Sequence, residues 1–381
     1  MYPVSAGYTF FVPKFQPAQP FSTMSVKFYP LTVSDLRRET PDTVSIAFAL
    51  PDDLRETFRF TQGQYLTLRT AMGGEEVRRS YSICAGVNDG ELRVAVKRVE
   101  DGRFSTWANT ALRIGDTLEV MPPQGRFFTP LSAEHQGTYV AFAAGSGITP
   151  ILSILKTTLE TEPKSRFILF YGNRTFDRII FREQLDALKN QFPERLSVHH
   201  ILSKETLGSE LFYGRLNGEK CAAYARYFFQ PAAVKAYFLC GPEEMIFSVK
   251  EAVETAGADP KAIHFELFTT PGMSTQAKAK AEERQLNAFD AQIKVIQDDM
   301  EFEFLLPSDG STLLDAAMRA GADLPFSCKG GVCATCKARI LEGEVEMDIN
   351  YGLEPDEVAA GYVLTCQSHP KSKRVVVSFD A

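Results

Sequence analysis

The stretch CKGGVCATC, from Cys328 to Cys336, places three cysteines and two glycines within one short loop. A fourth cysteine, Cys366, follows after 29 intervening residues, so the full spacing is C-x4-C-x2-C-x29-C. Structural zinc sites usually come as two short cysteine pairs around a longer loop, whereas here three ligands share one loop. The spacing is typical of plant-type 2Fe–2S sites. It predicts a two-iron cluster held by Cys328, Cys333, Cys336 and Cys366, with zinc as the alternative.

The small residues of this loop fit a cluster. Four thiolates and two sulfides concentrate negative charge, which backbone N–H groups must approach closely. Gly330 and Gly331 leave that approach unobstructed, and Ala334 and Thr335 keep the rest of the loop small. Because the amides must point inward, we expect an irregular loop here and no helix.

The 381 residues are enough for two or three domains, and 44% hydrophobic and 23% charged residues are typical of a globular protein. No apolar run approaches the roughly 20 residues that span a bilayer, so no membrane segment is expected. Residues 1–25 lack the pattern of a secretory signal and are expected to be an N-terminal extension of a cytoplasmic protein. Seven cysteines cannot all form disulfides, and their clustering favours metal ligation in a reducing compartment. Cys84 and Cys221 are expected in or near a core.

Charge is unevenly distributed along the chain. Residues 287–381 contain 16 Asp and Glu against 8 Lys and Arg, a balance of −8, whereas the whole chain carries −7. An acidic part on a nearly neutral body argues against nucleic acid or an anionic membrane as partner and favours a basic protein surface. Solubility alone would explain the same charge equally well.

Three blocks follow one another. Residues 26–130 contain short alternating runs separated by turns, which predicts an antiparallel β-barrel or sandwich. In residues 137–268, strand-like runs such as TYVAFAAG alternate with helical stretches, which predicts an α/β domain with a parallel sheet. Residues 269–286 are small and polar and are expected to be a linker. Residues 287–381 combine strands, one helix, the cysteine loop and a closing strand, so a smaller α+β domain is expected.

The run RRSYSICAG in the first block carries Arg79, Tyr81 and Ser82. Strand alternation puts Arg79 and Tyr81 on one face and Ser82 on the other. A bare R-x-Y-S is a weak signal, because any half-buried strand could show it, and its weight depends on the motif that follows.

That motif is GRFSTWAN, which begins at Gly102. It places Ser105 and Thr106 after a glycine turn at the expected start of a helix, where free N–H groups bind phosphate. Ser105 could equally be a plain N-cap, and the motif alone leaves both interpretations open.

The second block contains AAGSGITPI, which follows a buried strand and opens a helix. Gly145 and Gly147 permit a tight turn and the close approach of a pyrophosphate to the helix N-terminus, and Pro150 suits the first helical turn. The order G-x-G-x-x-P departs from the G-x-G-x-x-G of dinucleotide folds. Later in the block, LCGPEEM supplies Cys240, which taken alone is more typical of a buried strand end.

The choice of coenzyme is predicted from the end of the second strand. NAD sites prefer an acidic residue there, whereas the 2′-phosphate of NADP prefers arginine. The strand ends in Gly-Asn-Arg174, and no carboxylate follows before Asp177. We therefore expect NADPH, with NADH less favoured; a solvated loop arginine is the alternative role for Arg174.

Together the first two blocks resemble the ferredoxin-NADP reductase superfamily, whose flavin domain is a six-stranded antiparallel barrel. The resemblance implies FAD in residues 26–130, with FMN as the alternative, and a nicotinamide coenzyme in residues 137–268. It implies catalytic positions for Tyr81 on the isoalloxazine, Ser82 near flavin N5 and Cys240 near nicotinamide C4. The further binding residues that it implies are Arg79, Val96, Lys97, Arg98, Gly102, Ser105 and Thr106 for the flavin, and Gly145, Gly147, Thr149, Arg174, Gly241 and Pro242 for the nucleotide. By its position, Phe268 is expected to cover the flavin ring.

Residues 287–381 resemble a plant-type ferredoxin domain with a β-grasp fold. The order of domains resembles reductases of bacterial oxygenases, and YGNRTFDRIIFREQL, IHFELF and MDINYGLEPDEVAAGYVLTCQSHP are especially similar to reductase components of phenylacetyl-CoA epoxidases. The resemblance implies electron flow from NADPH to FAD, to the 2Fe–2S cluster and to an oxygenase or epoxidase on another chain. The alternatives are a reductase of another monooxygenase or of a ring-hydroxylating dioxygenase, and a non-catalytic scaffold, which the intact motifs disfavour.

Overall fold

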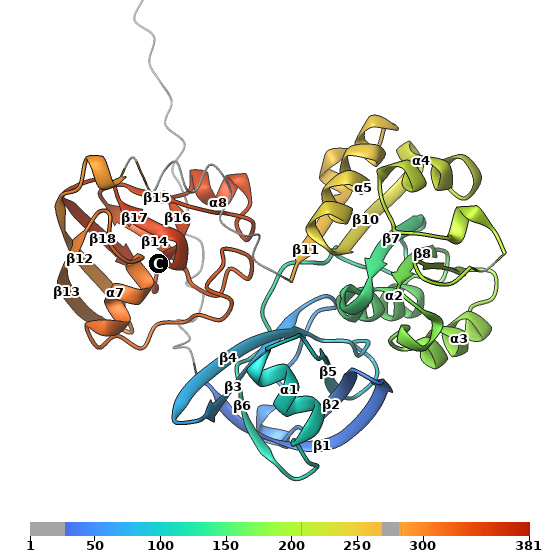
Figure 1. Cartoon of the computed structure of the whole chain (residues 1–381), viewed down its shortest axis with the longest axis horizontal. Coiled ribbons are helices and arrows are strands. Elements are labelled where there is room, and N and C mark those ends of the chain that lie inside the picture. Colours follow the sequence, from blue (N-terminus) through green and yellow to red (C-terminus); the bar gives the residue numbers. More distant parts are fainter. Residues whose placement is uncertain (1–26, 207, 269–281, 283) are drawn as a thin grey trace, which may run out of the picture.

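The computed structural model describes residues 27–206, 208–268, 282 and 284–381. Figure 1 shows a barrel in blue and teal, an α/β domain in green and yellow, and a C-terminal domain in orange and red. The predicted fold class, an antiparallel barrel followed by a parallel α/β domain and a small α+β domain, is confirmed. The predicted extension 1–25 and residues 269–281 and 283 of the predicted linker lie outside the described residues.

The barrel is a closed antiparallel sheet. Its strands are ordered β4-β3-β6-β1-β2-β5, and a bridge between Ile83 and Val94 joins the two ends of this order. Alternation along each strand turns one set of apolar side chains inward, and Leu66 and Leu68 belong to the core that they form. The elements are β1 (Tyr29–Thr40), β2 (Thr43–Ala49), β3 (Tyr65–Met72), β4 (Glu75–Ser82), β5 (Leu92–Lys97), α1 (Arg103–Thr110) and β6 (Thr117–Val120).

The α/β domain has three layers. Its parallel sheet has the order β11-β10-β7-β8-β9; α2 and α3 pack on one face, and α4 and α5 on the other. Burial on both faces explains the continuous apolar run of β7. The chain enters the sheet at β7, adds β8 and β9 on one side of it, and then adds β10 on the other side. This change of side creates a ligand crevice at the carboxyl ends of β7 and β10. The elements are β7 (Thr138–Ala144), α2 (Ile148–Thr161), β8 (Arg166–Asn173), α3 (Arg182–Gln191), β9 (Leu196–Leu202), α4 (Gly218–Tyr227), β10 (Val234–Gly241), α5 (Glu243–Thr255) and β11 (Ile263–Leu267).

The C-terminal domain packs α7 against a mixed sheet of order β13-β12-β18-β14-β16. Strands β12 and β18 are parallel, and the other neighbours are antiparallel. The cysteine loop connects α7 to β14 and contains no helix, as predicted. The elements are β12 (Asp290–Gln297), β13 (Met300–Pro307), α7 (Leu313–Arg319), β14 (Lys337–Glu342), β15 (Val345–Met347), α8 (Pro355–Ala359), β16 (Tyr362–Leu364), β17 (Ser368–Pro370) and β18 (Arg374–Ser378).

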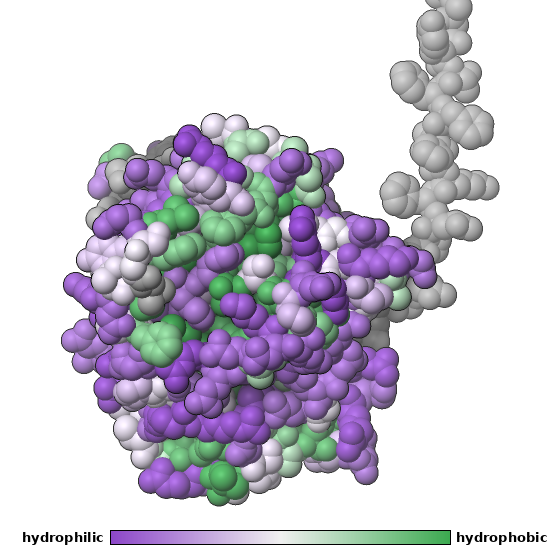
Figure 2. Space-filling model, turned by 90° about the vertical axis from the view of Figure 1, so that its right-hand side faces the viewer, coloured by the Kyte–Doolittle hydropathy of each residue, from purple (hydrophilic) through white to green (hydrophobic). Residues whose placement is uncertain are grey.

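Hydrophilic side chains cover most of the face in Figure 2, and hydrophobic ones gather only in limited areas of it. Within the described ranges, no helix is long and apolar enough to cross a membrane. Cys84 and Cys221 are buried, as expected.

Candidate functional site

The three domains meet at one cavity of about 1140 Å³. The barrel contributes β4 and the segment around the start of α1, the α/β domain contributes the turn after β7 and strand β11, and the C-terminal domain contributes its cysteine loop. The predicted residues that line it are Arg79, Tyr81, Ser82, Lys97, Arg98, Gly102, Ser105, Thr149, Phe268, Cys328 and Cys333. Residues from distant parts of the sequence are thus brought to a single space.

Among the barrel cations that line the cavity, three have no carboxylate partner in the described part of the chain. Arg79, Lys97 and Arg98 form no ion pair with any other described residue, and Arg79 instead donates to the carbonyl oxygen of Arg78 at 2.7 Å. Cations around an open space favour an anion, and the diphosphate of a flavin dinucleotide fits this donor set. Val96 is different: its side chain is buried in the barrel core, away from the cavity, and its carbonyl accepts from Asn109 at 3.0 Å.

The turn before α1 explains the roles of Gly102 and Ser105. The N-cap of α1 is Gly102, without a capping side chain, so Ser105 is not the N-cap that the sequence left open. Ser105 Oγ accepts from the Val99 N–H at 3.1 Å and donates to the Gly102 carbonyl at 3.2 Å. A Cβ on Gly102 would lie 2.4 Å from this Oγ, so a larger residue there would displace the Ser105 side chain. Ser105 therefore stabilises the turn at the cavity wall.

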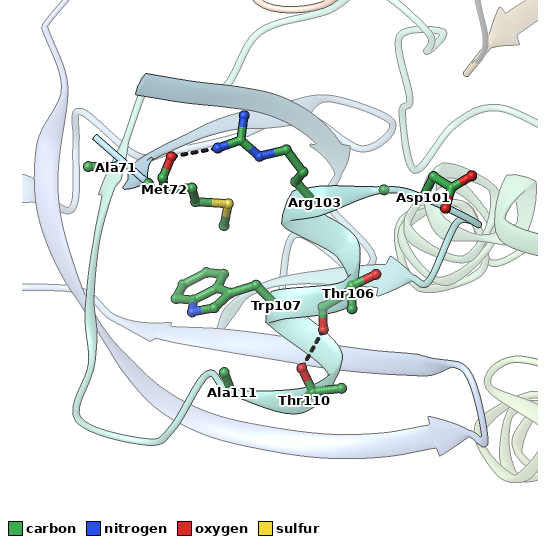
Figure 3. A pocket seen from close by; sticks show the side chains of 10 residues that line it. Ala71, Met72, Asp101, Arg103, Thr106, Trp107, Thr110 and Ala111 are labelled. Carbon is green, nitrogen blue, oxygen red and sulfur yellow. Dashed lines mark hydrogen bonds between the residues drawn. The ribbon is translucent and has the colours of Figure 1, made fainter. Parts of the chain in front are cut away.

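A second pocket of about 670 Å³ adjoins the cavity, and Gly102 and Arg103 line both. Figure 3 shows the Trp107 indole and the Met72 side chain facing this space, with Arg103 donating to the Met72 carbonyl at 2.5 Å. Thr106 lines this pocket and not the main cavity. The adenylate group that distinguishes FAD from FMN would pack against the Trp107 ring here, next to the cations of the main cavity.

A carboxyl group that the sequence analysis did not single out lies beside Ser82. Ser82 Oγ donates to Glu266 Oε2 at 3.1 Å, and both residues line the cavity. Burial raises the pKa of Glu266 to about 8, against the opposing effect of the Ser82 hydrogen bond. Burial and the charge of Glu266 also raise the pKa of two other groups, the Cys240 thiol on the adjacent strand and the Tyr65 hydroxyl. The one signal in the sequence is an acidic residue within the apolar strand IHFELF.

The nucleotide side depends on close backbone packing. A Cβ on Gly147 would lie 2.1 Å from the carbonyl oxygen of Cys240, so only glycine lets the two chain segments approach. Gly145 has a positive φ of 54°, and Thr149 Oγ1 donates to the Ser146 carbonyl at 3.0 Å. These residues shape the turn between β7 and α2 at the crevice of the sheet.

Three residues predicted for the nicotinamide lie just outside the cavity. Cys240 is completely buried, and burial together with the nearby Glu266 raises the pKa of its thiol. Pro242 is the N-cap residue of α5, and a Cβ on Gly241 would lie 2.7 Å from Met245 Cε. In this arrangement they pack the end of β10 and do not line the open space.

Arg174 lies at the exposed end of β8. Its backbone carbonyl accepts from the Lys204 N–H at 2.9 Å, and no described carboxylate pairs with its side chain. Arg178, by contrast, pairs with Asp42 of the barrel at 2.9 Å. Glu205, in the neighbouring loop after β9, accepts from the Phe176 N–H at 2.8 Å through its carboxylate. The guanidinium of Arg174 thus remains available for an anion at this end of the sheet.

The four cysteines of the motif come together as two pairs. The Cys328 and Cys333 thiols hydrogen-bond to each other, and so do those of Cys336 and Cys366. No three His, Cys, Asp or Glu side chains of the described residues converge to hold a single metal ion. Two pairs of sulfurs fit a cluster with two ligands on each of two irons better than a tetrahedral zinc site.

Backbone amides surround the first pair, as the glycines of the loop predicted. The N–H groups of Gly330 and Cys333 donate to Cys328 Sγ at 3.3 and 3.4 Å. The hydrogen bond from the Cys333 thiol, together with these amides, lowers the pKa of the Cys328 thiol. Gly331 has a φ of 75°, and a Cβ there would lie 2.9 Å from the Ile349 carbonyl oxygen. The loop thus stabilises thiolate charge in a conformation that needs glycine.

Known families match successive parts of the chain. An oxidoreductase FAD-binding domain matches residues 30–129, an oxidoreductase NAD-binding domain residues 142–251, and a 2Fe–2S iron–sulfur cluster binding domain residues 295–371. The chain is 49% identical to a subunit of the 1,2-phenylacetyl-CoA epoxidase of Escherichia coli (strain K12), covering 93% of this chain and 98% of that protein. It is 38% identical to the ferredoxin reductase component of 3-ketosteroid-9-alpha-monooxygenase of Rhodococcus rhodochrous, covering 92% and 96%. The chain belongs to this family of oxygenase reductases.

Solved structures share the fold. Phthalate dioxygenase reductase aligns with a TM-score of 0.56 at 22% identity, covering 92% of this chain and 98% of that one. An intact type IV self-sufficient cytochrome P450 monooxygenase aligns with a TM-score of 0.66 at 22% identity, covering 92% of this chain and 41% of that one. At 22% identity the likeness shows a shared fold, and it covers all three domains.

As an oxygenase reductase, the chain carries electrons from a nicotinamide coenzyme through FAD and a 2Fe–2S cluster to an oxygenase component. Bound FAD supplies the exchange between hydride, which brings two electrons, and a cluster that takes one electron at a time. The residues of the chain bind and orient these groups, and the Ser82–Glu266 pair can hold a proton beside them near neutral pH. No residue of the site needs to attack an organic substrate.

The Cys336→Ser variant tests the cluster. Removing one thiolate ligand should abolish the reduction of cytochrome c, a one-electron protein acceptor, by the nicotinamide coenzyme, while reduction of ferricyanide by the same coenzyme persists through the flavin. Iron and acid-labile sulfide, measured after anaerobic purification, should be two of each per wild-type chain. Zinc in the wild-type protein would contradict the assignment.

The Glu266→Gln variant tests the buried carboxyl group. Between an unfolded pKa of about 4.5 and a folded pKa of about 8, the folded state holds a proton that the unfolded state releases. This contribution to stability is therefore fully present below the unfolded pKa and is lost as pH rises toward 8. The free energy of unfolding should fall less steeply over this range in Glu266→Gln than in the wild type, measured by denaturant titration.

The kinetic consequence appears in the same variant. The rate of flavin reduction in stopped flow should depend on a group with an apparent pKa near 8 in the wild type, and this dependence should vanish in Glu266→Gln. Glu244→Gln, at an exposed carboxylate of α5, is the matched control. Identical pH profiles in all three proteins would rule out a role for Glu266.

Proposed function

We propose that this oxygenase reductase serves a phenylacetyl-CoA epoxidase and takes its electrons from NADPH. The observation that carries the proposal is the 49% identity to the Escherichia coli epoxidase subunit, which extends over 98% of that protein. An identity of this size over the whole length includes the C-terminal domain, whose surface must meet the acceptor. The stretch MDINYGLEPDEVAAGYVLTCQSHP, one of those that resemble epoxidase reductases, contains α8, β16, β17 and the segment that carries Cys366.

A second candidate is a reductase for another monooxygenase. The 38% identity to the 3-ketosteroid-9-alpha-monooxygenase component of Rhodococcus rhodochrous supports it, also over nearly the full length. Both candidates require the same cofactors and the same electron path through the chain. They differ only in the acceptor, so a test must use the acceptor itself.

NADPH is proposed as the donor because Arg174 is an exposed cation at the end of β8 without a carboxylate partner among the described residues. Lys204, whose backbone contacts the same loop, adds a second positive charge nearby. The rival is NADH, for which Glu205 offers a carboxylate, but the Phe176 N–H already occupies one of its oxygens. A charge-assisted contact to a 2′-phosphate favours NADPH.

Roles for the lining residues follow from their places in the cavity. We assign the flavin diphosphate to Arg79, Lys97, Arg98 and the Gly102 turn. Tyr81, whose ring packs 5.5 Å from that of Phe104, would lie on the isoalloxazine, and Ser82 would lie near its N5. The proposed domain limits 26–130 and 287–381 are supported by the FAD-binding and 2Fe–2S family matches at residues 30–129 and 295–371.

The acceptor surface is proposed to be basic. The C-terminal domain has 16 acidic against 8 basic residues, and Asp298, Asp299, Glu301 and Glu303 are exposed together on the hairpin of β12 and β13. Such charges steer encounter more than they hold a complex together. A cytoplasmic location is part of the proposal, because four thiols must remain reduced to bind the cluster.

Reconstitution tests the acceptor. The purified reductase, mixed with the catalytic components of a phenylacetyl-CoA epoxidase, should support NADPH- and oxygen-dependent consumption of phenylacetyl-CoA, followed by chromatography. The same amount of reductase with a 3-ketosteroid-9-alpha-monooxygenase should give much less turnover. The reverse ranking would establish the second candidate.

Salt tests the electrostatic part in the same assay. Because the screening length is about 8 Å at physiological ionic strength, turnover should fall between low and high salt, while ferricyanide reduction changes little. Turnover that is independent of salt would indicate that the oxygenase is recognised through apolar contacts.

The Arg174→Ala variant tests the coenzyme. Losing a charge-assisted phosphate contact should cost about 1.5–3 kcal/mol, which lowers kcat/KM for NADPH by roughly 10- to 100-fold and leaves that for NADH nearly unchanged. Arg226→Ala, which removes another exposed arginine of the same domain, should affect neither coenzyme. An equal loss with both coenzymes would show that Arg174 is structural.

A further inference from the structure

The cluster motif is open at one end only. Cys336 and Cys366 are 3% and 4% exposed, so this cysteine pair lies inside the C-terminal domain. Cys328 is exposed and Cys333 half-buried, and both line the cavity shared with the barrel. Electrons that enter or leave by the shortest path must therefore use the Cys328–Cys333 end, which faces the barrel in this structure.

The surface that meets this end is the polar face of the hairpin formed by β3 and β4. The cross-strand pairs Tyr65–Ser82, Thr67–Ser80 and Arg69–Arg78 lie on one face of the hairpin, and the alternate residues Leu66 and Leu68 are buried in the barrel core. Thr67 and Ser80 are also joined through their hydroxyls at 3.2 Å. A row of hydroxyl and guanidinium groups on the outside of a barrel is suited to polar contacts with another domain.

Two hydroxyls of this face contact the cysteine loop directly. The Tyr65 hydroxyl donates to the carbonyl oxygen of Cys333 and lies 2.9 Å from Thr335 Oγ1. Ser80 Oγ lies 2.6 Å from Ser327 Oγ, next to Cys328 in the chain. Both contacts are made to residues within or beside the open end of the cluster motif.

Arg78 is the charged anchor of the contact. Its side chain is only 3% exposed and donates to Asp323 Oδ1 at 3.2 Å and to the Leu324 carbonyl at 3.4 Å. Its guanidinium also lies 4.2 Å from the centre of the Phe326 ring, a cation–π contact between the domains. On its own side, Arg78 is held by Glu76 at 2.6 Å. A buried guanidinium with partners from both domains orients one domain on the other.

We propose that Tyr65, Arg78 and Ser80 form a docking face that holds the cluster against the flavin cavity, and that the oxygenase binds the same end of the C-terminal domain after this contact opens. The proposal rests on the positions proposed above for flavin and cluster. In each docked period one electron leaves the reduced flavin and one is taken up by the oxidised cluster, without any bond between the domains. Two such periods pass on the two electrons of one NADPH, and the proton released by the flavin goes to water.

The partner surface follows from the chemistry of the exposed end. Once undocked, the C-terminal domain presents the Asp323 carboxylate, the Phe326 ring and the Cys333 carbonyl oxygen. The matching oxygenase surface should offer what the barrel offers, namely a guanidinium group and a hydrogen-bond donor. The reductase can then serve flavin and oxygenase in turn but not together.

The Asp323→Lys variant tests the docking face, because it sets a second cation against buried Arg78. Asp323 touches neither the flavin cavity nor the nucleotide site, so NADPH-to-ferricyanide activity should be unchanged. Stopped-flow reduction of the cluster by NADPH should slow by about tenfold or more. Small-angle X-ray scattering of the holoenzyme should show a larger maximum dimension, which reports the separation of the domains independently of activity.

Asp309→Lys is the matched control, since it makes the same charge change at another exposed position of the C-terminal domain. It should match the wild type in both measurements. Tyr65→Phe, which keeps the ring and removes only the hydroxyl, should lower the rate of cluster reduction relative to the rate of flavin reduction measured in the same traces.

Wild-type rates of cluster reduction in both Asp323→Lys and Tyr65→Phe would overturn the proposal. So would an expanded shape of Asp323→Lys with an unchanged rate, because the docked arrangement would then not be the one that transfers electrons. Failure of the cofactor assignment would look different, since the wild type itself would lack flavin absorbance or the cluster signal. Failure of the epoxidase assignment leaves this assay untouched, because it ends at the cluster.

Discussion

Strand β4 alternates its side chains between two faces, and the arrangement of all three domains depends on this alternation. Arg79 and Tyr81 lie on one face and Arg78, Ser80 and Ser82 on the other, and all of these except Arg78 line the cavity. Ser82 reaches Glu266 of the α/β domain, and Ser80 and Arg78 reach the C-terminal domain. A slip of one residue in the pairing of β3 with β4 would exchange the two faces and remove both sets of contacts at once.

Electrostatics divides the molecule into regions of different charge. Within the described residues, the cavity carries cations that form no ion pair, which suits a diphosphate, whereas the C-terminal domain has an excess of acidic residues. Arg78 joins the two regions. Its guanidinium is withdrawn from water while the Asp323 side chain stays 77% exposed, so the contact contributes more to orientation than to net affinity. That property suits a contact that forms and opens during each turnover.

How much of the site could be predicted depends on how far apart in the sequence the residues of each part lie. The cysteine loop is local, so the spacing of its cysteines and glycines was enough to predict its irregular backbone and to nominate its ligands. Ser105 and Thr106 are adjacent in sequence, yet helix α1 directs them to different spaces, one to the main cavity and one to the Trp107 pocket. Val96 and Lys97 point to opposite faces of their strand, and the side chain of Val96 lies in the barrel core. Cys240 and Glu266 lie opposite each other only because β10 and β11 are neighbours in the sheet. The cysteine belongs to a known motif and was predicted, whereas no local pattern marked the carboxylate.

The three domains, their order and the chemistry that each can hold were readable from residue patterns, because these depend on side-chain periodicity and on ligands spaced closely along the chain. Packing in three dimensions was needed to bring the flavin, nucleotide and cluster motifs to one cavity, to set Glu266 beside Ser82, and to bring Tyr65 and Arg78 onto the C-terminal domain. Tyr65 and Cys333 are 268 residues apart, and no periodicity or motif spans that distance. Such contacts arise when separately folded domains pack together, and that packing depends on the complementarity of whole surfaces.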